Sequence, residues 1–122
     1  MSDVDNHPKL VWLDLEMTGL DPDSERIIEI ATIVTNFELN EVVEGPNLVI
    51  HQPNEFIENM DDWNLSHHSE SGLIEAVKAT KVSTEQAEEE TLRFLEQHTS
   101  KGKSPLCGNS IHHDRRFLSR YM

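Results

Sequence analysis

The sequence predicts an α/β fold in which a sheet is flanked by helices. Residues 10–16, 26–36 and 41–51 are rich in apolar and β-branched side chains and are joined by short turn sequences, which predicts three strands in an antiparallel meander. Residues 56–69 and 84–98 carry apolar side chains at helical spacing. Residues 106–109 then predict a short buried strand, and a helix begins at Asp114.

The strands differ in the positions they are expected to take in the sheet. Residues 26–36 are apolar on both faces, which is typical of a central strand. Gly45 and Pro46 interrupt residues 41–51, and this indicates a bulge or an edge strand.

The helical half of the sequence has clear start and stop signals. The first helix, residues 56–69, carries Phe56, Ile57, Met60, Trp63 and Leu65. Gly72 allows a helix to stop, and a second short apolar face follows at Leu73, Ile74 and Val77. Residues 83–86 (STEQ) form a capping box that opens a helix. Its expected inward stripe is Ala87, Thr91, Phe94, Leu95 and His98, and its many glutamates form a solvated face.

Composition excludes several classes of protein. The 122 residues suffice for one domain, which we place at residues 9–122 behind a disordered leader at residues 1–8. Apolar runs are too short to span a membrane, no secretory signal is present, and Cys107 is the only cysteine. A cytoplasmic location fits the absence of a secretory signal and the single cysteine. The net charge of −13 argues against a protein that coats a nucleic-acid duplex, although five basic residues lie within residues 101–122.

Two acids in the first strand are the leading candidates for a functional site. Asp14 and Glu16 are two residues apart, so both point to one face of the strand. One interpretation is a site for a divalent metal, which would offset their repulsion. The other is the wet face of an edge strand whose Leu13 and Leu15 face the core. We interpret Glu29, in the second strand, as a structural, hydrogen-bonded acid rather than a ligand.

Several blocks of sequence favour the metal interpretation. Residues 14–20 (DLEMTGL), followed by residues 26–31 (RIIEIA), resemble the first motif of the DEDD family of 3′→5′ exonucleases, and within it the oligoribonucleases. The further matches are 60–64 (MDDWN), 71–73 (SGL), 103–110 (KSPLCGNS) and 114–118 (DRRFL). The resemblance implies a ribonuclease H-like mixed sheet whose fourth strand is parallel to the first and brings Asn109 and Asp114 near Asp14.

The resemblance also implies a chemistry. Asp14, Glu16 and Asp114 match three of the family's four metal-binding acids, which hold two Mg²⁺ or Mn²⁺ ions for phosphodiester hydrolysis. The expected product is mononucleotides from short single-stranded oligoribonucleotides. Residues implied in substrate binding are Leu20, Trp63, His68, Asn109 and Ser110. Trp63 would be a core residue from its helical pattern alone, but the resemblance favours stacking on a base. We interpret His67, His112 and His113 as surface histidines.

One part of the family's pattern has no match. Its third motif supplies a general-base His and a fourth metal-binding Asp, and neither residue type follows Asp114. We therefore expect an N-terminal portion of a homodimeric oligoribonuclease, truncated before the last strand and the C-terminal helices. We expect this stretch alone to be inactive, and to aggregate through the exposed edge at residues 106–109. The alternatives are a catalytically dead fragment that binds metal or nucleotide, and a DNA proofreading exonuclease.

Overall fold

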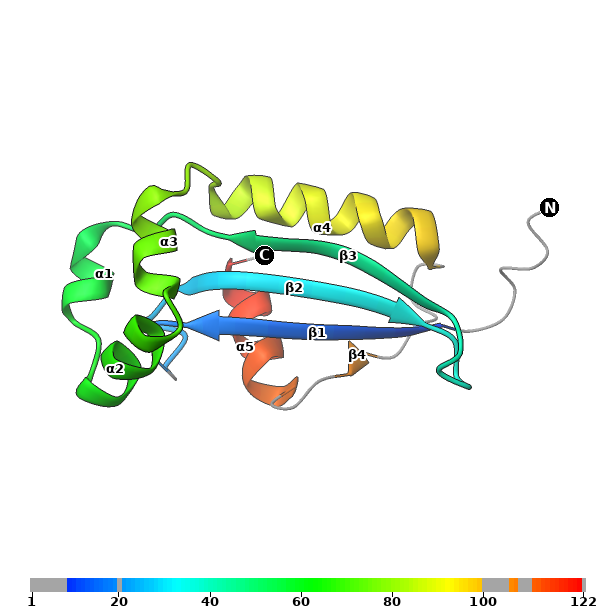
Figure 1. Cartoon of the computed structure of the whole chain (residues 1–122), viewed down its shortest axis with the longest axis horizontal. Helices are drawn as coiled ribbons and strands as arrows, with labels where there is room; N and C mark the ends of the chain where they lie inside the picture. The colour runs from blue at the N-terminus through cyan, green and yellow to red at the C-terminus, as the bar shows by residue number, and fades with distance from the viewer. Residues whose placement is uncertain (1–8, 20, 100–105, 108–110, 122) are drawn as a thin grey trace.

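The structure is a computed structural model that describes residues 9–19, 21–99, 106–107 and 111–121. It contains a four-stranded sheet in the order β3-β2-β1-β4, flanked by helices (Figure 1). The strands are β1 (Leu10–Met17), β2 (Ile27–Thr35), β3 (Val42–Val49) and β4 (Leu106–Cys107). β2 pairs antiparallel with both β1 and β3, whereas β4 pairs parallel with β1. The expected α/β class, the meander and the mixed sheet are confirmed.

β1 lies inside the sheet rather than at its edge. Its side chains alternate strictly, with Val11, Leu13 and Leu15 buried and Trp12 and Asp14 exposed. In the register with β2, Trp12 lies opposite Ile33 and Glu16 opposite Glu29. Because β4 pairs with β1 at Val11 and Trp12, the interpretation of β1 as an edge strand is wrong for this end of the strand. Asp14 and Glu16, nearer the other end, pair with β2 alone among the described residues.

β3 forms the opposite edge of the sheet and contains the expected bulge. Ala31 pairs with Asn47 and Ile33 with Glu44, so two β3 residues, Gly45 and Pro46, lie opposite one residue of β2. Proline lacks the N–H that a central strand needs, and the edge position removes that need.

The helices differ from the expected pattern at one place. They are α1 (Asn54–Glu58), α2 (Asp62–Glu70), α3 (Leu73–Ala79), α4 (Thr84–His98) and α5 (Ile111–Tyr121). The single helix expected over residues 56–69 is wrong, because the chain breaks at Asn59–Asp61 and restarts. The Asp61 side chain accepts a hydrogen bond from the Asn64 backbone N–H at 2.8 Å, so Asp61 caps α2.

Two apolar clusters hold these elements together. The first joins one face of the sheet to α4 and α5 through Leu13, Leu15, Ile30, Ala87 and Phe117. The second packs α1, the connection after it and α3 against the start of β2, and its members are Ile28, Ile57, Met60, Leu73, Ile74 and Val77. Figure 1 shows the consequence, with α5 behind the sheet and α1–α3 grouped where β1 ends. No helix in the described part of the chain is long and apolar enough to cross a membrane.

Arg26 links the start of β2 to two helices. Its guanidinium lies 4.3 Å from the ring centroid of Phe56 in α1 and 4.8 Å from that of Tyr121 in α5. It also donates a hydrogen bond to the Tyr121 hydroxyl, which itself donates to the Pro22 carbonyl. Cation–π contacts of this kind contribute about 0.5–2 kcal/mol each, depending on desolvation. Arg26 thus fixes the last turn of α5 against the connection between β1 and β2.

The close contact between α4 and β3 depends on Gly45. A Cβ atom at this position would lie 2.5–2.8 Å from ring atoms of Phe94. We expect Gly45→Ala to lower the free energy of unfolding by about 1–3 kcal/mol through overpacking. In a Phe94→Ala background the same change should cost almost nothing, as measured by denaturant unfolding of the four variants.

Gly72→Ala is the control for this cycle. Gly72 has φ +79° and open space around it, so alanine there costs about 1–2 kcal/mol of backbone strain whether or not Phe94 is present. Equal costs of Gly45→Ala with and without Phe94 would show that the ring does not set the distance between α4 and β3.

Candidate functional site

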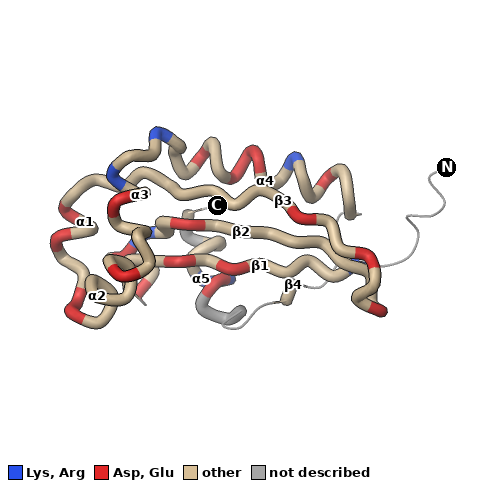
Figure 2. Tube along the Cα trace, in the orientation of Figure 1, with Lys and Arg blue, Asp and Glu red and all other residues tan. Residues whose placement is uncertain are grey.

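Three carboxylates from two neighbouring strands face the same side of the sheet. Asp14 and Glu16 project from β1 away from the buried Leu13 and Leu15. Glu29 of β2 lies directly across from Glu16. Figure 2 shows acidic positions on both β1 and β2, which lie side by side in the sheet.

The crowding of these acids changes the protonation of Glu29. Partial burial raises the pKa of the Glu29 carboxyl above its ordinary value of 4.5, and the nearby charges of Glu16 and Asp14 raise it further. Within the described part of the chain, no hydrogen bond reaches this carboxylate. The expectation of a hydrogen-bonded structural acid is therefore wrong, and Glu29 belongs electrostatically with the two acids of β1.

α2 brings an aromatic side chain and two histidines to the end of β1. Its burial pattern is the reverse of an ordinary amphipathic helix, because Asn64 and His68 are buried while Trp63 and Leu65 are exposed. The exposure of Trp63 is 69%, so the core role suggested by its helical pattern is wrong. An exposed indole beside a row of carboxylates is suited to stacking on a planar ligand.

His68 is held by the end of β1. Its exposure is 2%, and its Nε2 lies 2.9 Å from the carbonyl oxygen of Met17. A carbonyl only accepts hydrogen bonds, so Nε2 carries the proton and Nδ1 is the nitrogen with a free lone pair. Nδ1 is buried and has no hydrogen-bond partner among the described residues.

His67 lies closer to the acids than the sequence suggested. It is exposed, as expected, and its ring stacks on Trp63 with centroids 5.0 Å apart and an interplanar angle of 10°. One donor atom each of Glu16, His67 and His68 lie within 4.8 Å of one another. His67 is thus a surface histidine, as expected, and the structure adds that it lies near Glu16 and His68 at the end of β1.

Asp114 lies in a helix that packs against β1. It lies in the first turn of α5, it is 3% exposed, and α5 packs against β1 through Phe117. The parallel pairing of β4 with β1 gives this helix its place, as the family resemblance implied. Leu20, Asn109 and Ser110, and the side chains of His112 and His113, lie outside the described residues.

The donor set at β1 fits a hard divalent cation. Carboxylate oxygens are the ligands that Mg²⁺ and Mn²⁺ prefer, and Asp14 and Glu16 present them on one face. Burial first, and then the charges of Glu16 and Asp14, raise the pKa of the neighbouring Glu29 carboxyl. A bound cation would remove the repulsion among these carboxylates.

A family profile described as exonuclease, of the RNase T type, matches residues 11–122 of this chain. The chain belongs to the exonuclease family. It is 63% identical over 113 residues to the oligoribonuclease of Coxiella burnetii, covering 93% of this chain and 62% of that protein. It is 58% identical over 117 residues to the oligoribonuclease of Shewanella sp. strain W3-18-1, covering 96% of this chain and 65% of the relative. The resemblance noted from the motifs is confirmed, and this exonuclease chain spans less than two thirds of those relatives' length.

Sequence reasoning missed two members of the site. Glu29 carried a usable signal, since it is a single acid inside an otherwise apolar strand. His67 carried a weaker signal, because the pair His67-His68 follows Trp63 by about one helical turn. The convergence of His67 and His68 on Glu16 depends on where α2 starts, and Asp61 sets that start through a cap that the apolar pattern does not reveal.

Glu29→Gln should stabilise the metal-free exonuclease chain at neutral pH. A carboxyl whose pKa is raised on folding destabilises the fold when ionised, and this cost vanishes below its ordinary pKa. We expect the Tm at pH 7 in EDTA to rise by about 1–3 °C, after allowing for solvent screening. At pH 4 the two proteins should melt alike.

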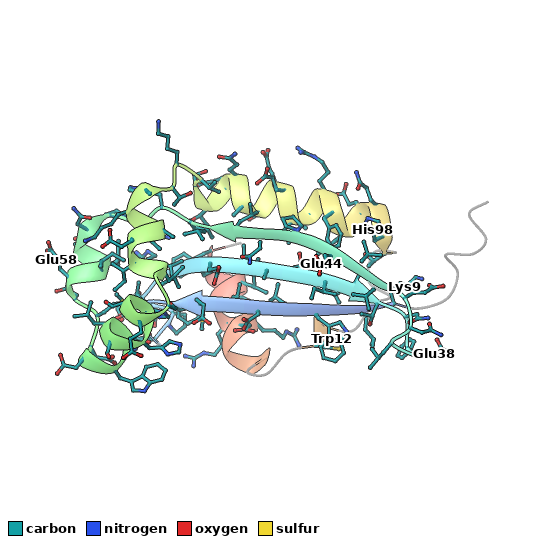
Figure 3. All side chains as sticks on the ribbon, in the orientation of Figure 1. Lys9, Trp12, Glu38, Glu44, Glu58 and His98 are labelled. Carbon is teal, nitrogen blue, oxygen red and sulfur yellow. The ribbon has the colours of Figure 1, made fainter. Side chains whose placement is uncertain are left out.

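The matched control is Glu38→Gln, because Glu38 is exposed in the turn between β2 and β3 (Figure 3). It should leave the Tm unchanged at both pH values. An equal rise for both variants would mean that overall net charge, rather than the local cluster, causes the effect.

Proposed function

We propose that this exonuclease, in its complete form, is a 3′→5′ exoribonuclease that degrades very short oligoribonucleotides to mononucleotides. The observation that carries the proposal is the row of acids on β1 and β2, together with the exposed Trp63 that stacks on His67 of the same helix. Acids at this position suit metal-dependent phosphodiester hydrolysis, and an exposed indole suits a base. The names of the relatives point to the same substrate class.

The chain's own side chains would divide the work at the reaction centre. Asp14, Glu16 and Asp114 would hold two Mg²⁺ or Mn²⁺ ions. Those ions would supply an activated water and stabilise charge on the phosphate and the leaving oxygen. Glu29 would keep the local field negative and so favour divalent over monovalent cations.

Substrate binding would use contacts that do not depend on sequence. Trp63 can stack on any base, which contributes about 1–3 kcal/mol per base. His68, fixed by the Met17 carbonyl, would face the substrate, with Leu20, Asn109 and Ser110 as further proposed contacts. The net charge of −13 suits a short substrate held at its end rather than a long backbone tracked along a basic groove.

The general base is the part of the proposal that residues 1–122 do not provide. No His or Asp follows Asp114, so we propose that this stretch alone is inactive. Loss of a general base typically lowers the rate about 10²–10⁴-fold. A catalytically dead fragment that binds metal or nucleotide is the second candidate, and the acids of β1 are the observation behind it. The MDDWN block at residues 60–64 makes a DNA proofreading exonuclease less favoured. A cytoplasmic homodimer remains part of the proposal for the complete protein.

The deciding experiment makes two measurements on the natural gene product. One is its intact mass, and the other is its hydrolysis of a labelled dinucleotide in Mn²⁺, with and without chelator. A mass above 14.0 kDa with chelator-sensitive cleavage supports the exoribonuclease. A mass of 14.0 kDa without cleavage supports the dead fragment. Cleavage by the 122 residues alone would refute the need for a further His and Asp.

Asp14→Asn should separate stability from metal binding. Without metal it relieves the repulsion among the acids, so the Tm should stay equal or rise. Saturating Mn²⁺ stabilises a protein by about 2.7 kcal/mol at a hundred times its Kd, and the variant should lose most of that gain. Thermal melts with and without Mn²⁺ measure both effects, and Glu38→Gln serves as the control that changes neither. A full Mn²⁺ response in Asp14→Asn would remove Asp14 from the metal site.

A further inference from the structure

Glu16, His67 and His68 form a group distinct in chemistry from the carboxylates of the proposed reaction centre. It offers two imidazoles and one carboxylate, and one donor atom from each lies within 4.8 Å of the others. Mg²⁺ takes oxygen ligands, whereas imidazole nitrogens suit zinc, copper, nickel and iron. Two histidines and a glutamate are a ligand set that proteins use to hold Zn²⁺.

His68 has the tautomer and the hydrogen bond that metal-binding histidines use. Such a histidine commonly donates its other ring N–H to a backbone carbonyl, which fixes the ring and the free lone pair. Here Nε2 donates to the Met17 carbonyl at 2.9 Å. Nδ1 is left buried in a side chain that is 2% exposed, with no partner in the described part of the chain. A buried acceptor without a partner is costly, and a bound cation would satisfy it.

To complete the coordination, His67 and Glu16 would move toward His68. In a tetrahedral site with Zn–N distances near 2.1 Å, donor atoms lie roughly 3.4 Å apart. In the metal-free structure the three donor atoms lie within 4.8 Å of one another. His67 is exposed and Glu16 is only partly buried, so both side chains are able to move inward. The stack on Trp63 restricts the His67 ring and keeps it beside His68, whose ring centroid lies 5.3 Å away.

We propose that Glu16, His67 and His68 bind a divalent transition-metal ion of the zinc class, with His68 coordinating through Nδ1. Solvent or a ligand atom would take the fourth position, because His67 is on the surface. Binding itself does not depend on the proposed exoribonuclease activity. One consequence does: Glu16 would serve both metal sites, so Zn²⁺ would compete with Mg²⁺ or Mn²⁺ for it.

The test measures Zn²⁺ binding to the full 122-residue chain by competition with a chromogenic chelator. We expect one Zn²⁺ per chain, and His67→Ala should weaken its affinity by about 10²-fold or more. His67 is exposed and lies outside the proposed catalytic machinery, so the variant should fold normally. His51→Ala, which removes an exposed histidine from a loop, is the matched control and should bind as the unmodified chain does. Equal affinity of all three proteins would overturn the proposal.

A second measurement tests the geometry directly. In ¹⁵N-detected spectra of the histidine rings, Zn²⁺ should shift Nδ1 of His68 and leave Nε2 protonated. Mg²⁺ should leave both His67 and His68 unchanged, and Zn²⁺ should leave His51 unchanged. A shift at Nε2 of His68, or no shift at His68, would contradict the proposed coordination. Because neither measurement uses RNA, failure here is distinguishable from failure of the proposed function.

Discussion

The alternation of side chains along β1 is the constraint on which the rest of the structure depends. One face of the strand, through Leu13 and Leu15, provides the centre of the core that α4 and α5 cover. The other face carries Asp14 and Glu16. Since a strand has a period of two, a shift of one residue in register would bury the acids and expose the leucines. The apolar face thus fixes the register, and the register fixes which side the acids take.

Gathering acids on one face of β1 and β2 destabilises the fold, and the apolar residues buried on the other face offset that destabilisation. Asp14 and Glu16 lie on one face of β1, and the pairing with β2 places a third acid, Glu29, directly across from Glu16. The pKa of the Glu29 carboxyl is raised by partial burial and, to a smaller extent, by the charges of Glu16 and Asp14. The buried apolar faces of β1 and β2 favour the same register. The same acids that suit the proposed site therefore lower the stability of the hairpin formed by β1 and β2, a trade-off that is common at functional sites.

The sequence predicted the sheet better than it predicted the helical end. Three strands, the central place of β2, the bulge at Gly45 and Pro46 and the parallel β4 all followed from local pattern or from the family resemblance. The apolar pattern failed over residues 56–69, where it predicted one helix with Trp63 and Leu65 inside. α2 buries Asn64 and His68 instead, because their partners are Asp61 and the Met17 carbonyl. Hydrogen bonds to a cap and to a strand end leave no periodic apolar signal, so the arrangement of His67, His68 and Glu16 was not predictable from pattern.

The reversed burial of α2 also explains how the site is assembled from both ends of the chain. α2 is attached to β1 by a hydrogen bond at His68, next to Glu16, rather than by an apolar stripe. α5 is attached by Phe117 to the core and by Tyr121 to Arg26 and Pro22. A helix rises about 1.5 Å per residue, so Asp114 lies roughly 10 Å along α5 from the anchored Tyr121. Phe117, buried in the core one turn after Asp114, and Tyr121 near the end of α5 both hold the helix that carries Asp114. Arg26, which stands between Phe56 and Tyr121, couples the helices of both ends to the one hairpin that carries the acids.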